Sequence, residues 1–99
     1  MAIVHVDDKD FDNSIKKGTV LVDFYADWCG PCRMLSPIIE ELVEQRDINV
    51  VKVNVDEANE TARKFGIMSI PTIIVFKDGK EINKQVGLCS KEELEKMIK

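Results

Sequence analysis

The chain has 99 residues, a formal net charge of −4 and a hydrophobic content of 44%. This length and composition predict a single globular domain over residues 1–99 and exclude an intrinsically disordered chain. The mild acidity argues against nucleic-acid binding, and no apolar stretch approaches the roughly 20 residues of a membrane-spanning helix. The first residues lack the basic and apolar regions of a secretory signal, so we expect a soluble cytoplasmic protein.

The N-terminal quarter predicts a strand, a short helix and a second strand. Residues 3–6 are strand-like. Asp7 and Asp8 are candidate N-caps for a following helix, on which Phe11 faces inward. Residues 20–25 are almost all β-branched, aromatic or aliphatic, which is typical of a strand covered on both faces at the centre of a parallel sheet.

The middle of the chain predicts a long helix and a third strand. Apolar residues recur at i, i+3, i+4, i+7 and i+8 over residues 35–43, as they do on an amphipathic helix. Pro37 lies inside this pattern and is expected to kink the helix, because it has no N–H to donate. Residues 49–55 are predicted to form a strand with Val51, Val53 and Val55 on one face and Lys52 on the other.

The second half predicts a short helix, a hairpin and a final helix. Asp56 is a candidate cap for a helix over residues 58–65. Residues 72–76 and 81–86 are strand-like and flank an Asp-Gly pair, which favours a two-residue type I′ turn. A capping box that starts at Ser90 opens the last helix. The order β-α-β-α-β-α-β-β-α predicts an α/β fold, in which a mixed sheet of about five strands lies between about four helices.

Two cysteines lie between the expected central strand and the long helix, in the sequence Trp28-Cys29-Gly30-Pro31-Cys32. Cysteines three positions apart at the start of a helix face the same side and are close enough for a disulfide. Free backbone N–H groups and the helix dipole favour the thiolate of Cys29, and we expect Cys32 to be the more buried residue. Redox chemistry is the leading interpretation of this pair.

Two other interpretations of the cysteine pair compete with redox chemistry. The pair resembles half of a zinc site, but such a site needs about four ligands. The remaining candidates, Cys89 and His5, do not supply a second close pair, so no metal site is predicted. We interpret His5 as a partly exposed structural residue. The second alternative is that both cysteines are unreactive core residues.

Asp23 is an acidic residue inside an apolar strand. Burial there would raise the pKa of its carboxyl, and Lys52 on a neighbouring strand is its natural partner. One interpretation is a surface-facing residue on an edge strand; the favoured one is a buried acid–base group that takes a proton from Cys32. Trp28 also has two interpretations, a core residue or part of an exposed docking surface beside the thiols.

These segments resemble the thioredoxin family over nearly the whole chain. The most specific match covers residues 22–32 and contains Asp23 and the Trp-Cys-Gly-Pro-Cys sequence. Further matches are Pro37, residues 52–56, residues 66–72, residues 76–79 and residues 86–87. The resemblance implies the thioredoxin fold.

The resemblance also assigns roles to individual residues. Cys29 would attack a target disulfide and Cys32 would resolve the mixed disulfide. Asp23, beside Lys52, would assist deprotonation of Cys32. Pro71 would be a cis-proline that faces the disulfide, although the residues alone leave cis and trans open. Gly30 and Pro31 would tune the redox centre, and the partner surface would contain Trp28, Gly30, Pro31, Ile70, Pro71 and Gly87.

The activity that the resemblance implies is that of a protein-disulfide reductase and electron carrier. Its substrates would be proteins with disulfides, and a thioredoxin reductase would supply reducing equivalents indirectly, with no cofactor bound to this chain. A monomer is expected. The alternatives are a disulfide oxidant or isomerase on the same fold, and a non-catalytic scaffold subunit of a partner enzyme. Oxidants favour a histidine between the cysteines, where this chain has Gly30 and Pro31.

Cys89 lies outside the family pattern, so the resemblance assigns it no role. The favoured interpretation is a small, partly buried apolar residue in the loop before the last helix. The alternative is an oxidisable thiol near the partner surface, with its pKa modestly lowered by the helix N-terminus.

Overall fold

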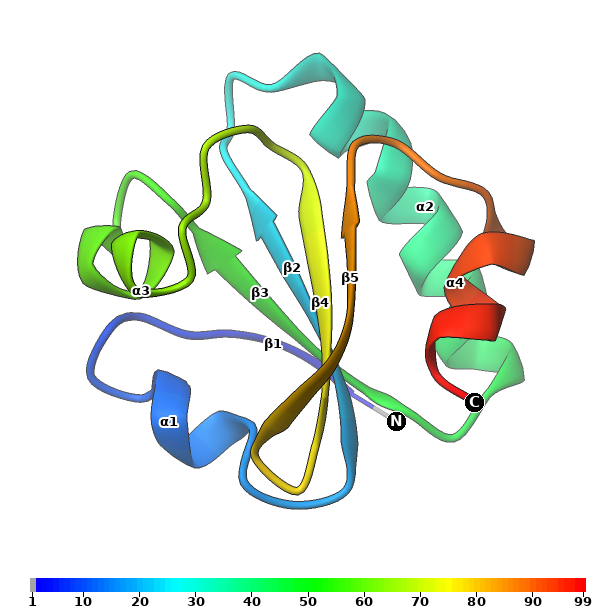
Figure 1. Ribbon diagram of the computed structural model, residues 1–99. Helices are drawn as coiled ribbons and strands as arrows, with labels where there is room; N and C mark the ends of the chain where they lie inside the picture. The colour runs from blue at the N-terminus through cyan, green and yellow to red at the C-terminus, as the bar shows by residue number, and fades with distance from the viewer. Residues whose placement is uncertain (1) are drawn as a thin grey trace.

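The computed structural model describes residues 2–99, so Met1 of the expected domain lies outside the described residues (Figure 1). The strands are β1 (Ile3–His5), β2 (Thr19–Tyr25), β3 (Asn49–Asn54), β4 (Thr72–Lys77) and β5 (Lys80–Val86). The helices are α1 (Phe11–Ser14), α2 (Gly30–Gln45), α3 (Asn59–Lys64) and α4 (Lys91–Met97). This order confirms the predicted succession of strands and helices.

The five strands form one mixed sheet in the order β1-β3-β2-β4-β5. β3 pairs in parallel with both β1 and β2, whereas β4 is antiparallel to β2 and to β5. Helices α1 and α3 cover one face of the sheet, and α2 and α4 cover the other (Figure 1). The predicted α/β fold with a five-stranded mixed sheet is confirmed.

The central strand β2 sends alternate side chains into two separate cores. Val20, Val22 and Phe24 belong to the cluster that contains Phe11 of α1. Leu21 belongs to the cluster under α2 and α4. Because residues two apart on a strand share a face, Asp23 lies on the side of Leu21, beneath α2.

Two of the predicted helix caps are wrong, and the reason is tertiary. Within residues 2–99, α1 begins after Asp10 with no side-chain cap, and Asp7 accepts a hydrogen bond only from the backbone N–H of Asp10. Asp8 instead accepts hydrogen bonds at the N-terminus of α3, from the N–H (2.7 Å) and hydroxyl (2.6 Å) of Thr61. Asp56 does not cap α3 but accepts from the indole of Trp28.

The hairpin turn and the last capping box agree with the structure, and the kink at Pro37 stays a prediction. The turn residues Asp78 and Gly79 both have positive φ, of 50° and 87°, as a type I′ turn requires. The capping box at Ser90 and Glu93 is formed in both directions. Helix α2 continues as one element through Pro37.

Candidate active site

The cysteine pair lies where β2 ends and α2 begins. Cys29 is the N-cap of α2 and forms a disulfide with Cys32, with 5.3 Å between the two Cα atoms. The backbone N–H of Cys32 donates to Cys29 Sγ at 3.2 Å, so the first turn of the helix provides a hydrogen bond to this sulfur. The two residues are 4% and 3% exposed, and the expected difference in burial is therefore negligible.

The loop before β4 faces the disulfide, and the loop after β5 is hydrogen-bonded to that loop. The Ile70–Pro71 peptide bond is cis, as the resemblance implied, and the carbonyl oxygen of Ile70 lies 3.8 Å from Cys29 Sγ. Gly87 has a φ of 95°, which few other residues adopt, and its N–H donates to the carbonyl of Pro71 at 2.8 Å. The loop after β5 is thereby attached to the segment that faces Cys29.

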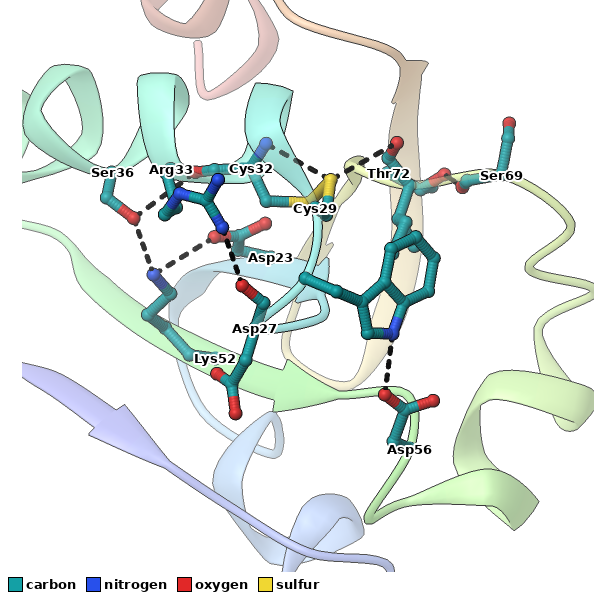
Figure 2. Close-up of a disulfide and its surroundings, with 12 residues drawn as sticks. Asp23, Asp27, Cys29, Cys32, Arg33, Ser36, Lys52, Asp56, Ser69 and Thr72 are labelled. Atoms are coloured by element: carbon teal, nitrogen blue, oxygen red, sulfur yellow. Dashed lines mark hydrogen bonds and ion pairs between the residues drawn. A yellow bond between two sulfur atoms is a disulfide. The ribbon is translucent and has the colours of Figure 1, made fainter.

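Trp28 lies on the surface beside the disulfide and is not a core residue. It is 69% exposed, and its indole N–H donates to Asp56 Oδ2 at 2.9 Å (Figure 2). A shallow, mainly apolar pocket of about 160 Å³ adjoins it, and Met68 is exposed at its rim. The pocket is lined by Trp28, Val55, Ile67, Met68, Ser69 and Ile70. Such a patch is typical of a docking surface for another chain.

Asp23 is fully buried behind the cysteines, and the interpretation as a surface residue on an edge strand is excluded. Burial raises the pKa of its carboxyl to about 6, and the ammonium of Lys52 opposes that rise. The two groups form an ion pair with 3.4 Å between Lys52 Nζ and Asp23 Oδ2. Neither carboxylate oxygen has a well-formed hydrogen bond within residues 2–99. Figure 2 shows the carboxylate between the disulfide and Lys52.

Sequence reasoning missed the groups that surround Lys52. The ammonium donates to the Ser36 hydroxyl at 3.0 Å and lies 4.7 Å from the centre of the Tyr25 ring. A pocket of about 190 Å³ opens beside it and is lined by Tyr25, Ala26, Asp27, Cys32, Arg33, Ser36 and Lys52. The one available signal was the spacing of Ser36, which follows Cys32 by four residues and so shares its helix face.

His5 and Cys89 lie outside this constellation. His5 is exposed and packs edge-on against Tyr25. Cys89 is buried under α4, in agreement with the favoured interpretation as an apolar core residue. Burial raises the pKa of its thiol, so the lowering by the helix N-terminus that the alternative interpretation included is wrong. In the part of the chain that the structure describes, no group of three or more His, Cys, Asp or Glu residues could hold a metal ion. None of the described helices has the length and apolar character needed to cross a membrane.

Two cysteines three residues apart at a helix start, opposite a cis-proline and in front of a buried carboxylate, define a dithiol–disulfide oxidoreductase. The thioredoxin family profile matches residues 2–99. Thioredoxins of Staphylococcus saprophyticus and Staphylococcus epidermidis are 53% and 51% identical to this chain, and each alignment covers 99% of it and 96% of the relative. The chain belongs to the thioredoxin family, and it acts as a protein-disulfide reductase by dithiol–disulfide exchange.

Solved structures give the same result at the level of the fold. The reduced thioredoxin pre-protein of Schistosoma mansoni superposes with a TM-score of 0.92 at 39% identity, over 99% of this chain and 96% of that one. A mutant thioredoxin from Halobacterium salinarum NRC-1 superposes with a TM-score of 0.90 at 39% identity, over 98% of this chain and 88% of that one.

Proposed function

We propose that Cys29 is the attacking nucleophile and Cys32 the resolving thiol of this reductase. In the reduced protein, the Cys29 thiolate attacks one sulfur of a substrate disulfide, and the other substrate sulfur leaves as a thiolate and takes up a proton. Cys32 then loses its proton and attacks Cys29 Sγ, which releases the second substrate sulfur and forms the Cys29–Cys32 disulfide. Two electrons pass from the dithiol to the substrate.

The position of Cys29 supports its role as the nucleophile. It is the N-cap of α2, where unpaired N–H groups and the dipole stabilise a thiolate. Its sulfur faces the Ile70 carbonyl at the edge of the apolar surface around Trp28. A substrate bound on that surface would reach Cys29 first.

We assign Asp23 as the group that accepts the Cys32 proton, with Lys52 as its charged partner. A carboxyl with a pKa near 6 is close to neutral pH, where proton transfer to and from a thiol is effective. It is fully buried beneath α2, and the loss of its hydration is what raises its pKa. Gly30 and Pro31 occupy the first turn between the cysteines and carry no charge that would stabilise the thiolate further.

The substrates that fit this site are extended segments of proteins with disulfides. Trp28 and Ile70 line a shallow pocket, and the buried Pro71 next to Ile70 accepts a hydrogen bond from Gly87. The backbone of Ile70 would pair with an extended peptide without reading its side chains, which favours broad substrate choice. We also propose that a thioredoxin reductase reduces the disulfide, and that the protein works as a monomer in the cytoplasm without binding nucleic acid or a membrane.

The observation that carries these assignments is the different surroundings of the two sulfurs, and single substitutions test it. Cys29→Ser should abolish dithiothreitol-driven reduction of insulin disulfides. Cys32→Ser should attack once and remain as a mixed disulfide, so Cys32→Ser protein incubated with cell extract should retain partners that dithiothreitol releases. If Cys29→Ser retains partners and Cys32→Ser does not, the roles are reversed. A protein without either cysteine should reduce nothing; undiminished partner activation by that variant would indicate a scaffold role.

A further inference from the structure

Ser36 links the resolving cysteine to the lysine behind it. Its hydroxyl donates to the backbone carbonyl of Cys32 at 3.3 Å and accepts from Lys52 Nζ at 3.0 Å. A hydroxyl has a single proton to donate, and here that proton is directed to the carbonyl. The lone pairs of the oxygen are therefore free to accept from the ammonium, and Figure 2 shows Lys52 Nζ in contact with both Ser36 and Asp23.

The ammonium of Lys52 has room to leave this position. The Lys52 side chain is 13% exposed and lines the pocket of about 190 Å³ beside α2. Asp27 lines the same pocket and offers a solvated carboxylate, whereas Asp23 is fully buried. A flexible lysine gains hydration when it turns toward the pocket, so a second hydrogen bond on the buried side favours the inward position.

We propose that Ser36 is a positioning residue, whose hydroxyl holds the Lys52 ammonium against the Asp23 carboxylate so that more of Asp23 is ionised when Cys32 resolves. The inference rests on the proposed function for its consequence in catalysis, since that function assigns Asp23 as the proton acceptor. Its structural part, the position of Lys52, stands on the two hydrogen bonds and the ion pair.

Few other charged or titratable groups surround this pair. Tyr25 and Lys52 come from the sheet, Cys32 comes from α2, and Asp27 and Arg33 lie at the pocket rim. Arg33 donates to the backbone carbonyl of Asp27 at 2.8 Å and forms no ion pair with Asp23 among the described residues. Cys89 lies before α4 in the core on the same face of the sheet as Asp23, and burial raises the pKa of its thiol. Lys52 is thus the one cation among the described residues that forms an ion pair with Asp23.

Removal of the Ser36 hydroxyl should raise the pKa of Asp23. In Ser36→Ala the ammonium loses an acceptor and spends more time in the pocket, so the carboxylate loses favourable Coulomb energy and its pKa rises above about 6. A rise of about one pH unit would reduce the ionised fraction of Asp23 roughly fivefold at pH 6 and little at pH 8.5. Alanine is a strong helix former, so α2 should remain intact.

Two readouts separate this inference from the proposed function. The first is the titration of the Asp23 carboxyl carbon by NMR in oxidised protein, which requires no catalysis. The second is the reaction of reduced protein with dithionitrobenzoate, a disulfide that releases one thionitrobenzoate when Cys29 attacks and a second when Cys32 resolves. The rate of the second release, measured from pH 5 to pH 9, reports resolution alone.

The variants are Ser36→Ala, Ser36→Thr, Lys52→Met and the double variant Ser36→Ala/Lys52→Met. We expect Ser36→Ala to raise the titration midpoint of the Asp23 carboxyl. It should also slow the release of the second thionitrobenzoate about three- to fivefold at pH 6, whereas the rates of variant and parent should become equal at high pH. Ser36→Thr retains a hydroxyl and should restore both values. In the Lys52→Met background, Ser36→Ala should change neither the Asp23 midpoint nor the rate of the second release.

The opposite results overturn the inference. An unchanged Asp23 midpoint in Ser36→Ala would show that the hydroxyl does not control Lys52. An equal shift in the Lys52→Met background would show that Ser36 acts through the Cys32 carbonyl instead. A raised midpoint with an unchanged second release would support the positioning of Lys52 and overturn the assignment of Asp23 as the proton acceptor.

Discussion

At the scale of single residues, the active site contains a buried carboxylate, that of Asp23, within a mainly apolar core. Asp23 is fully buried on the central strand, and its only ionic partner within residues 2–99 is Lys52 at 3.4 Å. A buried carboxylate without full hydrogen bonding destabilises the folded state, because its hydration is lost and only partly replaced. The loss of hydration raises the pKa of Asp23 to about 6. A carboxyl with such a pKa can exchange protons near neutral pH, as the proposed role requires.

The first prediction concerns the pH dependence of stability. The pKa of Asp23 is raised from 3.8 to about 6 on folding, so the folded state binds the proton more tightly than the unfolded state. Its contribution therefore favours folding below about pH 4 and is lost as the pH rises through 6. We compare the free energy of unfolding of oxidised Asp23→Ala with that of the oxidised parent. The variant's gain in stability should be larger at pH 8 than at pH 4, by up to about 3 kcal/mol.

Urea denaturation of both proteins at pH 4 and pH 8 measures this difference. Asp27→Ala is the matched control, because Asp27 is an exposed aspartate of the same region. An Asp23→Ala protein that is less stable than the parent at pH 8 and resolves mixed disulfides at the parent rate would contradict both the energetic and the catalytic assignment.

At the scale of elements, the short helices depend on groups far away in the sequence. Helix α3 begins at Asn59, and its first N–H groups are satisfied by Asp8, which lies 52 and 53 residues before the two donors. Burial of Phe11 and Phe65 in one aromatic cluster brings these two segments together. Local patterning identified both helices, but their caps were decided by which segments the sheet places side by side.

The second prediction tests that cap. Hydrogen bonds from Thr61 lower the pKa of Asp8 below its usual value, so its stabilising contribution is present above pH 4 and is lost as the pH falls through the lowered pKa. Asp8→Ala should lower the Tm at pH 7 and have little effect in strong acid, because three hydrogen bonds to the carboxylate are lost.

Asp10→Ala provides the comparison, since Asp10 precedes α1 without making a side-chain cap hydrogen bond in the described chain. Thermal unfolding followed by circular dichroism at pH 7 and pH 2 gives all the required values. Equal Tm changes for Asp8→Ala and Asp10→Ala would show that the Asp8 contacts contribute nothing specific.

At the scale of the whole molecule, two cores on opposite faces of one sheet hold the redox centre in place. The core under α2 and α4 includes Leu35, Leu42, Cys89 and Leu94. Polar contacts at its edge join the same helices, with Lys91 donating to Glu41 at 3.1 Å. Because α2 carries both cysteines at its start, the packing of α4 on α2 also fixes the position of the disulfide.

The third prediction uses Cys89 as a reporter of that packing. The thiol is 5% exposed and its pKa is raised by burial, so it should react slowly in the folded protein. In the Cys29→Ser/Cys32→Ser background, labelling by a thiol reagent in native buffer should be on the order of 100-fold slower than in denaturant. Rapid native labelling, together with peroxide-induced dimers that disappear in Cys89→Ala, would identify Cys89 as an accessible oxidisable thiol instead.

Periodicity, turn chemistry and cysteine spacing were sufficient to predict the order of elements, the mixed sheet, the hairpin turn and the redox pair. These features depend on neighbours within one helix turn or one hairpin, where the sequence acts directly on the backbone. The buried charge at Asp23 was also predictable, because an acidic residue flanked by apolar strand residues is carried into the core with them. By itself, the sequence therefore determined the fold class and the reacting sulfurs.

Only the tertiary structure decided which distant groups surround those sulfurs. Three hydrogen bonds join separate elements of the fold. Asp8, which precedes α1, caps α3 instead, the indole of Trp28 donates to Asp56, and Lys52 donates to the hydroxyl of Ser36. Such contacts depend on the register of the strands and the rotation of each helix over the sheet, which side-chain packing in the two cores selects. Residue spacing along the chain carries no information about that packing.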